Sequence, residues 1–337
     1  SETSGKFRYG IGADITTKDF DNNDLGINFE TNFYSFYGNT SYRILNPTKY
    51  FNSFNARINT YSQFQKETGK IQSGNINFQI NSNTKKNNYF GFGIDASPIE
   101  TFNYYEARTA DRYVITPAEI SAFVYISSNY NKPFAFDFNP SYAVFNENGR
   151  NSYGFSASPR YRFTDKLAIN YTFDFLRKNN NKGYIDSIDD DMNAVTPNTI
   201  IFANRNVITY SNTFSGKYAL NSRMTFNLSV RHYWSYAENK NILSLQQNGR
   251  LTDYTGYTTN KNSSFYSWNT DLSYSWWFAP GSQLSILYRN NAGAFERSIN
   301  KDFRNNVTNL LTNDALNHVF SISVRYFIDY NQVKNKF

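Results

Sequence analysis

The sequence predicts an all-β protein that forms a transmembrane, antiparallel up-and-down β-barrel of about fourteen strands, with short periplasmic turns and long extracellular loops. Three observations lead to this fold class. Apolar and aromatic residues recur at every second position, charged residues fall on the positions between them, and long connections alternate with short ones. A period of two indicates β-strands, so each strand has one apolar face and one polar face.

Residues 265–290 show the repeating unit, which is a strand, a tight turn and a second strand. Between 266 and 278 the even positions are Tyr, Trp, Thr, Leu, Tyr, Trp and Phe, whereas the odd positions are mostly Ser, Asn and Asp. Residues 279–282 (Ala-Pro-Gly-Ser) supply turn chemistry, and the apolar parity resumes over 284–288. Aromatic residues gather at the strand ends, as in the girdles that flank the apolar band of a membrane-spanning barrel.

The same alternation recurs along the whole chain, which is expected to form a single domain over residues 1–337. The expected strands lie over residues 6–15, 34–44, 54–60, 76–80, 90–96, 120–126, 134–144, 153–163, 167–175, 208–218, 224–230, 266–278, 284–288 and 317–330. Loops follow the odd-numbered strands and short turns follow most others, although the third and seventh connections are short for outer loops. A soluble β-sandwich, the alternative, gives no reason for this segregation.

Charged residues in the middle of strands test the membrane hypothesis independently, because Arg or Lys in lipid at the midplane costs about 2–4 kcal/mol. They fall on the polar parity. The expected lumen-lining residues are Arg8, Arg43, Arg57, Asp95, Asp137, Arg160, Arg162, Asp174, Lys217, Arg231, Asp271, Arg289 and Arg325. The expected lipid-facing residues include Leu272, Tyr274, Leu284, Ile286, Phe320, Ile322 and Val324. The surplus of basic residues predicts a lumen that attracts anions. The same residues are equally compatible with a blocked barrel in which they form ion pairs with one another.

Composition excludes several other classes of protein. No stretch approaches the ~20 consecutive apolar residues that a spanning helix requires. The chain has no cysteine, and its net charge of +7 is spread without a basic block, which argues against a nucleic-acid interface. No cofactor is expected.

Few residues suggest catalysis or metal binding, and an enzyme is not expected. His232 and His318 share the apolar parity near strand ends, where an aromatic-like rim position is the favoured interpretation. Two acidic clusters resemble cation ligands, and the second could instead bind surface saccharide through hydrogen bonds, but solvated turns explain both better. These clusters are Asp19, Asp21, Asn23, Asp24 and Glu30, and Asp186, Asp189, Asp190 and Asp191.

The last long loop has helical rather than strand periodicity. Its apolar residues Ile299, Phe303, Val307, Leu310 and Leu311 are spaced for a short amphipathic helix. Such a helix could cover the barrel mouth, whereas packing under neighbouring loops is slightly favoured.

Four segments together resemble a known family: 18–26 (KDFDNNDLG), 103–108 (NYYEAR), 276–289 (WWFAPGSQLSILYR) and 320–331 (FSISVRYFIDYN). The chain resembles the C-terminal β-barrel domain of a Bacteroidetes outer-membrane family of unassigned function, whose members usually carry a carbohydrate-binding-module-family-9-like domain ahead of the barrel. That domain is absent here, and barrels of the family begin upstream of residue 1. The resemblance therefore implies that the chain is part of a larger barrel, and it supplies no catalytic residues.

The leading functional hypothesis is a channel or transport component for small polar or anionic solutes in the outer membrane of a Gram-negative bacterium. A second is a membrane anchor or partner subunit of an envelope complex that binds glycan or protein through its long loops. A third is the C-terminal barrel part of an energy-coupled receptor. The expected partners are outer-membrane lipid and lipopolysaccharide, with other envelope proteins or glycan as further candidates, and no nucleic acid.

Overall fold

A computed structural model gives the structure of the chain and describes residues 5–21, 31–188, 199–312, 316–328 and 334. These residues form an all-β fold with the single helix α1 (Phe303–Thr312). Among them, no helix is long and apolar enough to cross a membrane.

The strands of the main path correspond one to one to those expected from the sequence. They are β1 (Phe7–Thr16), β2 (Phe33–Ile44), β3 (Phe51–Gln65), β4 (Ile71–Thr84), β5 (Tyr89–Ser97), β8 (Glu119–Ser127), β9 (Phe134–Phe145), β10 (Asn151–Arg162), β11 (Leu167–Ile188), β12 (Thr199–Asn221), β13 (Met224–Leu245), β15 (Ser263–Ala279), β16 (Ser282–Glu296) and β17 (Asn317–Arg325). Three short strands lie in the long connections: β6 (Thr101–Asn103), β7 (Val114–Thr116) and β14 (Leu251–Asp253).

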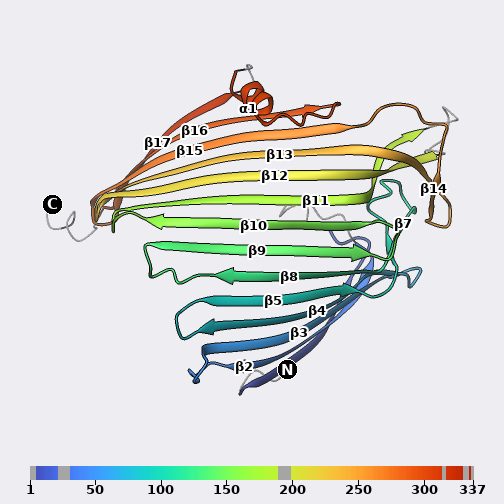
Figure 1. The fold of residues 1–337 in the computed structure, drawn as a ribbon, viewed down its shortest axis with the longest axis horizontal. Helices are drawn as coiled ribbons and strands as arrows, with labels where there is room; N and C mark the ends of the chain where they lie inside the picture. The colour runs from blue at the N-terminus through green and yellow to red at the C-terminus, as the bar shows by residue number, and fades with distance from the viewer. Residues whose placement is uncertain (1–4, 22–30, 189–198, 313–315, 329–333, 335–337) are drawn as a thin grey trace.

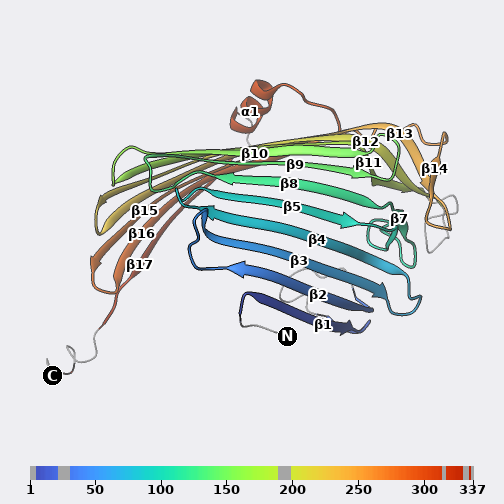
Figure 2. The ribbon, with the colours of Figure 1, turned by 60° about the horizontal axis from the view of Figure 1, so that its bottom comes forward.

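Each of the fourteen strands of the main path pairs antiparallel with the next strand of that path, so the sheet is an up-and-down meander. The main sheet has 15 strands, because β14 pairs with β13 beside the main path, and β6 and β7 form a separate two-stranded sheet. Figures 1 and 2 show the main strands side by side in one arched sheet. The long connections and the short strands lie at one end, called here the loop end, together with the short β3–β4 and β9–β10 connections. The remaining connections are short and lie at the other end, the turn end.

The described sheet is open. β1 pairs with β2 and β17 with β16, but β1 and β17 do not pair with each other in the described part of the chain. They lie at opposite edges of the arch (Figure 2). Ile11 on β1 is 87% exposed and Phe320 on β17 is 66% exposed. The all-β, antiparallel part of the sequence prediction is thus confirmed, whereas closure of the barrel by pairing of the first and last strands is not found.

Three strands run much further than the sequence pattern suggests. β11, β12 and β13 have 22, 23 and 22 residues, and they extend into segments that were expected to be loops (178–205 and 238–263). The extensions are rich in Asn and Lys and lose strict alternation. A register shift lies between Lys178 and Asn181, where Asn180 has a positive φ of 50°. This irregularity has the form of a β-bulge, which interrupts the period of two without ending the strand.

The extensions are stabilised by a small core at the loop end. The excursion between β5 and β8, which contains β6 and β7, contributes Ala107 and Val114. These residues pack against Phe202 of β12 and Leu243 of β13. Residues 200–203 of β12 are buried at both parities, so this strand end is covered on both faces. The loop end is therefore a packed structure.

Helix α1 is confirmed and packs on the apolar face of the sheet. Leu310 is fully buried in a cluster with Trp234, Tyr236 and Tyr266, which share the apolar parity of β13 and β15. Figure 2 shows α1 on the convex side of the arch. The helix thus packs on three large aromatic side chains of the sheet rather than over the mouth or under a neighbouring loop.

Replacing Leu310 by Ala should loosen α1, because truncating a fully buried Leu costs about 2–5 kcal/mol. Trypsin cleavage after Arg304 in the folded protein should then accelerate at least tenfold. Leu311→Ala is the matched control, since Leu311 is 39% exposed. Equal cleavage rates in the two variants would contradict the docking of α1 described here.

Candidate functional site on the polar face

The cross-strand register places all expected lumen-lining residues on one face of the sheet. Each pair of neighbouring strands keeps one register through its middle. Residues that lie opposite each other therefore point to the same face of the sheet on every strand. For example, Ser41 lies opposite both Arg8 and Arg57, and Asp271 lies opposite Arg289. The same register places the expected lipid-facing residues of β15, β16 and β17 on the other, apolar face. The two sets are therefore separated by the backbone itself.

One ion pair spans neighbouring strands on this polar face. The guanidinium of Arg289 donates to both carboxylate oxygens of Asp271, with Nε–Oδ1 2.6 Å and Nη2–Oδ2 3.1 Å. Both side chains remain substantially exposed, so the pair fixes geometry more than it adds stability. Within the described residues, the other eight cations of the expected set form no ion pair.

Several of these cations are instead held by neutral partners. Arg160 lies over the ring of Tyr130 at 5.1 Å, and Arg325 lies over the ring of Trp277 at 5.2 Å. Arg325 also donates to Gln283, with Nη2–Oε1 2.9 Å. Aromatic faces and amides position a cation without cancelling its charge. The surplus positive charge of this face therefore remains available to an anion.

Toward β5 the polar face is lined by amides. Asn59 donates to Asn77 (Nδ2–Oδ1 3.0 Å), and Asn77 donates to Asp95 (Nδ2–Oδ1 2.8 Å). This chain of hydrogen bonds crosses three strands and leaves the carboxylate held by an amide. The remaining expected residues Arg43, Arg162, Asp137, Asp174, Lys217 and Arg231 lie at polar-face positions of β2, β10, β9, β11, β12 and β13.

A hollow of about 500 Å³ lies on this face between β10 and β15. Its lining brings together Arg160, Lys217 and Asp271, with Asn170 and Asn227 among the polar neighbours. These groups come from five strands that are consecutive along the main path. The arrangement offers hydrogen-bond donors and two cations to a small solute.

The histidines do not form a catalytic pair with serine. His232 is 4% exposed beneath α1, with Nε2 2.8 Å from Oδ1 of Asn306. His318 lies beside the hydroxyl of Tyr288, with Nδ1–Oη 2.9 Å. His232 is thus buried by a helix, which sequence parity could not show.

The acidic clusters lie mainly outside the described residues, which exclude 22–30 and 189–198. Asp186 is described, and it pairs with Lys261 (Oδ2–Nζ 2.8 Å) and accepts from Tyr257 (Oδ2–Oη 2.5 Å). Burial acts to raise the pKa of Asp186, but hydrogen bonds from Lys261 and Tyr257 outweigh it and lower the pKa. In the described part of the chain, no acidic or histidine cluster has the arrangement of a metal site.

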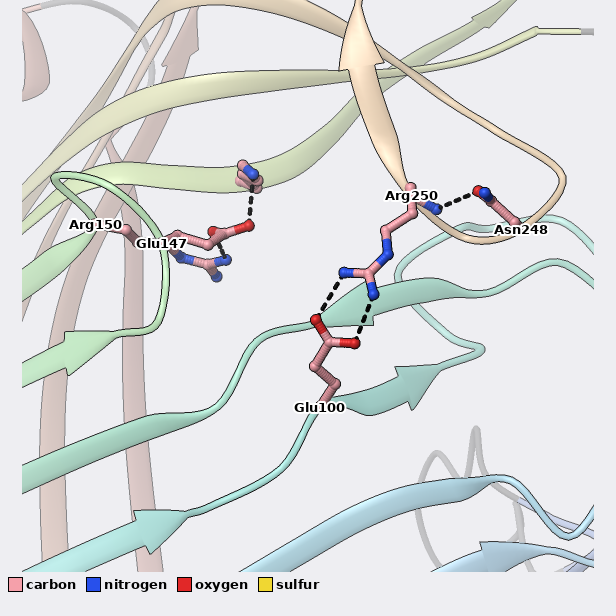
Figure 3. A network of polar contacts seen from close by, with 6 residues as sticks. Glu100, Glu147, Arg150, Asn248 and Arg250 are labelled. Carbon is pink, nitrogen blue, oxygen red and sulfur yellow. Dashed lines mark hydrogen bonds and ion pairs between the residues drawn. The ribbon is translucent and has the colours of Figure 1, made fainter.

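A second charged network lies at the loop end (Figure 3). Glu147, in the β9–β10 turn, binds Lys182 of β11 (Oε1–Nζ 2.6 Å) and Arg150 (Oε2–Nη1 2.8 Å). Burial acts to raise the pKa of Glu147, but hydrogen bonds from the two cations outweigh it, and the pKa lies below its ordinary value of 4.5. Beside it, Arg250 donates to both oxygens of Glu100, with both distances 2.7 Å.

Comparison with known protein families identifies the family of the chain. A family described as a domain of unknown function (DUF5916) matches residues 1–337. The chain belongs to this family. The match agrees with the resemblance to a family of unassigned function, which likewise covers essentially the whole chain. No curated protein matches this DUF5916 chain.

Sequence reasoning missed the loop-end residues of this DUF5916 domain. Glu147 was assigned to a turn, and Lys182 and Arg205 to a long loop, because the segments around them lack the period of two. The usable signal was charge, because residues 178–205 contain three cations, Lys178, Lys182 and Arg205.

Removing Lys182 should raise the pKa of Glu147. The folded pKa lies below the ordinary value, so the network stabilises the loop end above about pH 4.5, and this contribution disappears as the pH falls through the folded pKa. In Lys182→Met, a carbon-13 NMR titration of the Glu147 carboxyl should show a higher midpoint than in wild type. Lys178→Met, which removes a cation not bonded to Glu147, should leave the midpoint unchanged. A midpoint shifted equally by both variants would count against this network.

Proposed function

We propose that the chain forms the wall of an outer-membrane β-barrel that acts as a channel or transport component for small polar or anionic solutes. The single observation that carries the proposal is the division of the sheet between a continuous apolar face and a face that bears nine cations and four carboxylates of the expected set. A soluble protein rarely leaves so large an apolar surface uncovered. Lipid would cover it, and water would fill the polar side.

Helix α1 and the turn-end aromatics delimit the proposed membrane band. α1 covers Tyr266 at one end of β15, and Trp276 and Phe278 pack edge to face at the other, 5.7 Å apart. Residues 267–278 lie between these limits, close to the ~9–11 residues that a tilted strand needs to cross the hydrocarbon core. The extensions of β11–β13 would stand outside the membrane on the loop side.

The proposal requires that the two edges of the sheet be covered. An unpaired strand edge in hydrocarbon leaves backbone groups unsatisfied at several kcal/mol each. We propose that further strands pair with β1 and β17 and complete the barrel, and the family resemblance would place them upstream in the same polypeptide. A Bacteroidetes origin and a preceding carbohydrate-binding-module-family-9-like domain belong to the same proposal.

Replacing Ile286 by Arg should impair membrane insertion far more than replacing Ser285 by Arg. Ile286 lies on the apolar face and Ser285 on the polar face of the same strand, so only the first change puts a charge into hydrocarbon, at about 2–4 kcal/mol. Heat-modifiable gel migration of membrane fractions measures the folded share. Equal loss in both variants would contradict the assignment of the faces.

The full-length protein, reconstituted in planar bilayers, should conduct and should prefer anions. The reversal potential in a potassium chloride gradient measures this preference, and the double variant Arg160→Gln/Lys217→Gln should reduce it because both cations line the polar hollow. Arg304→Gln on α1, outside the proposed lumen, is the control. Absence of any conductance would refute the channel and favour a membrane anchor of an envelope complex.

A further inference from the structure

A second cavity, separate from the hollow on the polar face, lies where the β6–β7 excursion meets the extended hairpin of β11 and β12. Its volume is about 350 Å³. Glu106 and Glu119 line it together with Arg150, Lys182 and Arg205. A neighbouring cavity of about 170 Å³ shares Glu119 and Arg150 and adds Lys178. Charged residues distant in the chain are thus concentrated at one place.

Arg205 is the free cation of this cavity. No carboxylate of the described residues lies within ion-pair distance of it, and its Nε is buried without a hydrogen-bond partner. Such an orphaned donor in a native structure calls for a partner. Burial lowers the pKa of the Arg205 guanidinium, an effect only partly offset by the attraction of Glu106. An anion bound beside it would offset the cost of this desolvation by electrostatic attraction and hydrogen bonds.

The position of the Arg205 side chain depends on Gly183 of the neighbouring strand β11. A Cβ added to Gly183 would lie 2.1 Å from Nη2 of Arg205. The guanidinium therefore occupies the space above Gly183, and any side chain at that position would displace it. This arrangement holds the cation at the wall of the cavity.

The other two cations are fixed by Glu147 (Figure 3). Glu147 binds Arg150 and Lys182 through different carboxylate oxygens, at 2.8 and 2.6 Å. A lysine ammonium has three donors, of which Glu147 takes one. Donors for a ligand are thus held in place before the ligand arrives.

The wall formed by the excursion is also fixed. Glu100 binds Arg250 of the β13–β14 hairpin through two hydrogen bonds (Figure 3), and Arg112 donates to the carbonyl of Leu245, with Nη2–O 3.0 Å. The amide of Ile115 donates to the carbonyl of Gly249 at 2.9 Å. These ties hold the cavity wall against the extended strands, and a preorganised site loses less entropy when it binds.

We propose that this cavity binds a small carboxylate-bearing solute of monosaccharide size, with the carboxylate on Arg205 and hydroxyl groups on Lys182, Arg150 and Glu119. The size follows from the volume, which is at the lower end of small-molecule sites. The carboxylate follows from the free guanidinium, whose planar donors match that group. The inference deepens the proposed function by naming a solute class at its loop end, and it rests on that function only for the onward passage of the solute.

The test is equilibrium binding to the full-length protein in detergent micelles, measured by calorimetry with sodium glucuronate as the probe. Glucuronate should bind, and glucose, which has the same ring without the carboxylate, should bind at least tenfold more weakly. Arg205→Gln should lower the glucuronate affinity at least tenfold. Gly183→Ala, which keeps the charge but displaces it, should also lower the affinity. Arg223→Gln at the turn end is the control and should bind as wild type does.

Heat-modifiable migration establishes that each variant is folded. Undetectable glucuronate binding, equal binding of glucose, or unchanged binding in Arg205→Gln would overturn the inference. Glucuronate binding without bilayer conductance would support this site and refute the channel. Conductance without glucuronate binding would refute this site and leave the channel supported.

Discussion

The antiparallel backbone ladder is the constraint on which the rest of the structure depends. Each strand alternates its side chains between two faces, and each pair keeps its register through the middle. A slip of one residue in any pair would move every charge of that strand to the apolar face. The separation of Arg289 from Ile286, and of Asp271 from Leu272, is therefore a property of the ladder.

This constraint also explains what the sequence could predict. Period-two alternation located every strand of the main path, and parity assigned all thirteen expected charges to one face, because both are local properties of an extended chain. Helix α1 was found for the same reason, since its apolar spacing is helical. The pattern could not show that α1 covers His232, because that contact joins residues 74 positions apart.

The loop end was beyond sequence reasoning for a physical reason. The extensions of β11–β13 pack against the β6–β7 excursion and against β14, so their residues need not alternate between an apolar and a polar face. The bulge at Asn180 breaks the parity, and the cavity beside Arg205 is built from five separate segments. Barrel closure was equally undetermined, because parity says which face a residue takes and not whether the first and last strands meet.

The proposed membrane insertion places the apolar face of the sheet against lipid and the opposite face against water. The most direct measurement is a nitroxide scan of residues 284–289 on β16 in the reconstituted full-length protein, comparing collision with oxygen and with a water-soluble nickel chelate. Positions 284, 286 and 288 should be accessible to oxygen and 285, 287 and 289 to the chelate, with a period of two. A scan in which both parities are equally accessible to the chelate would contradict the claim.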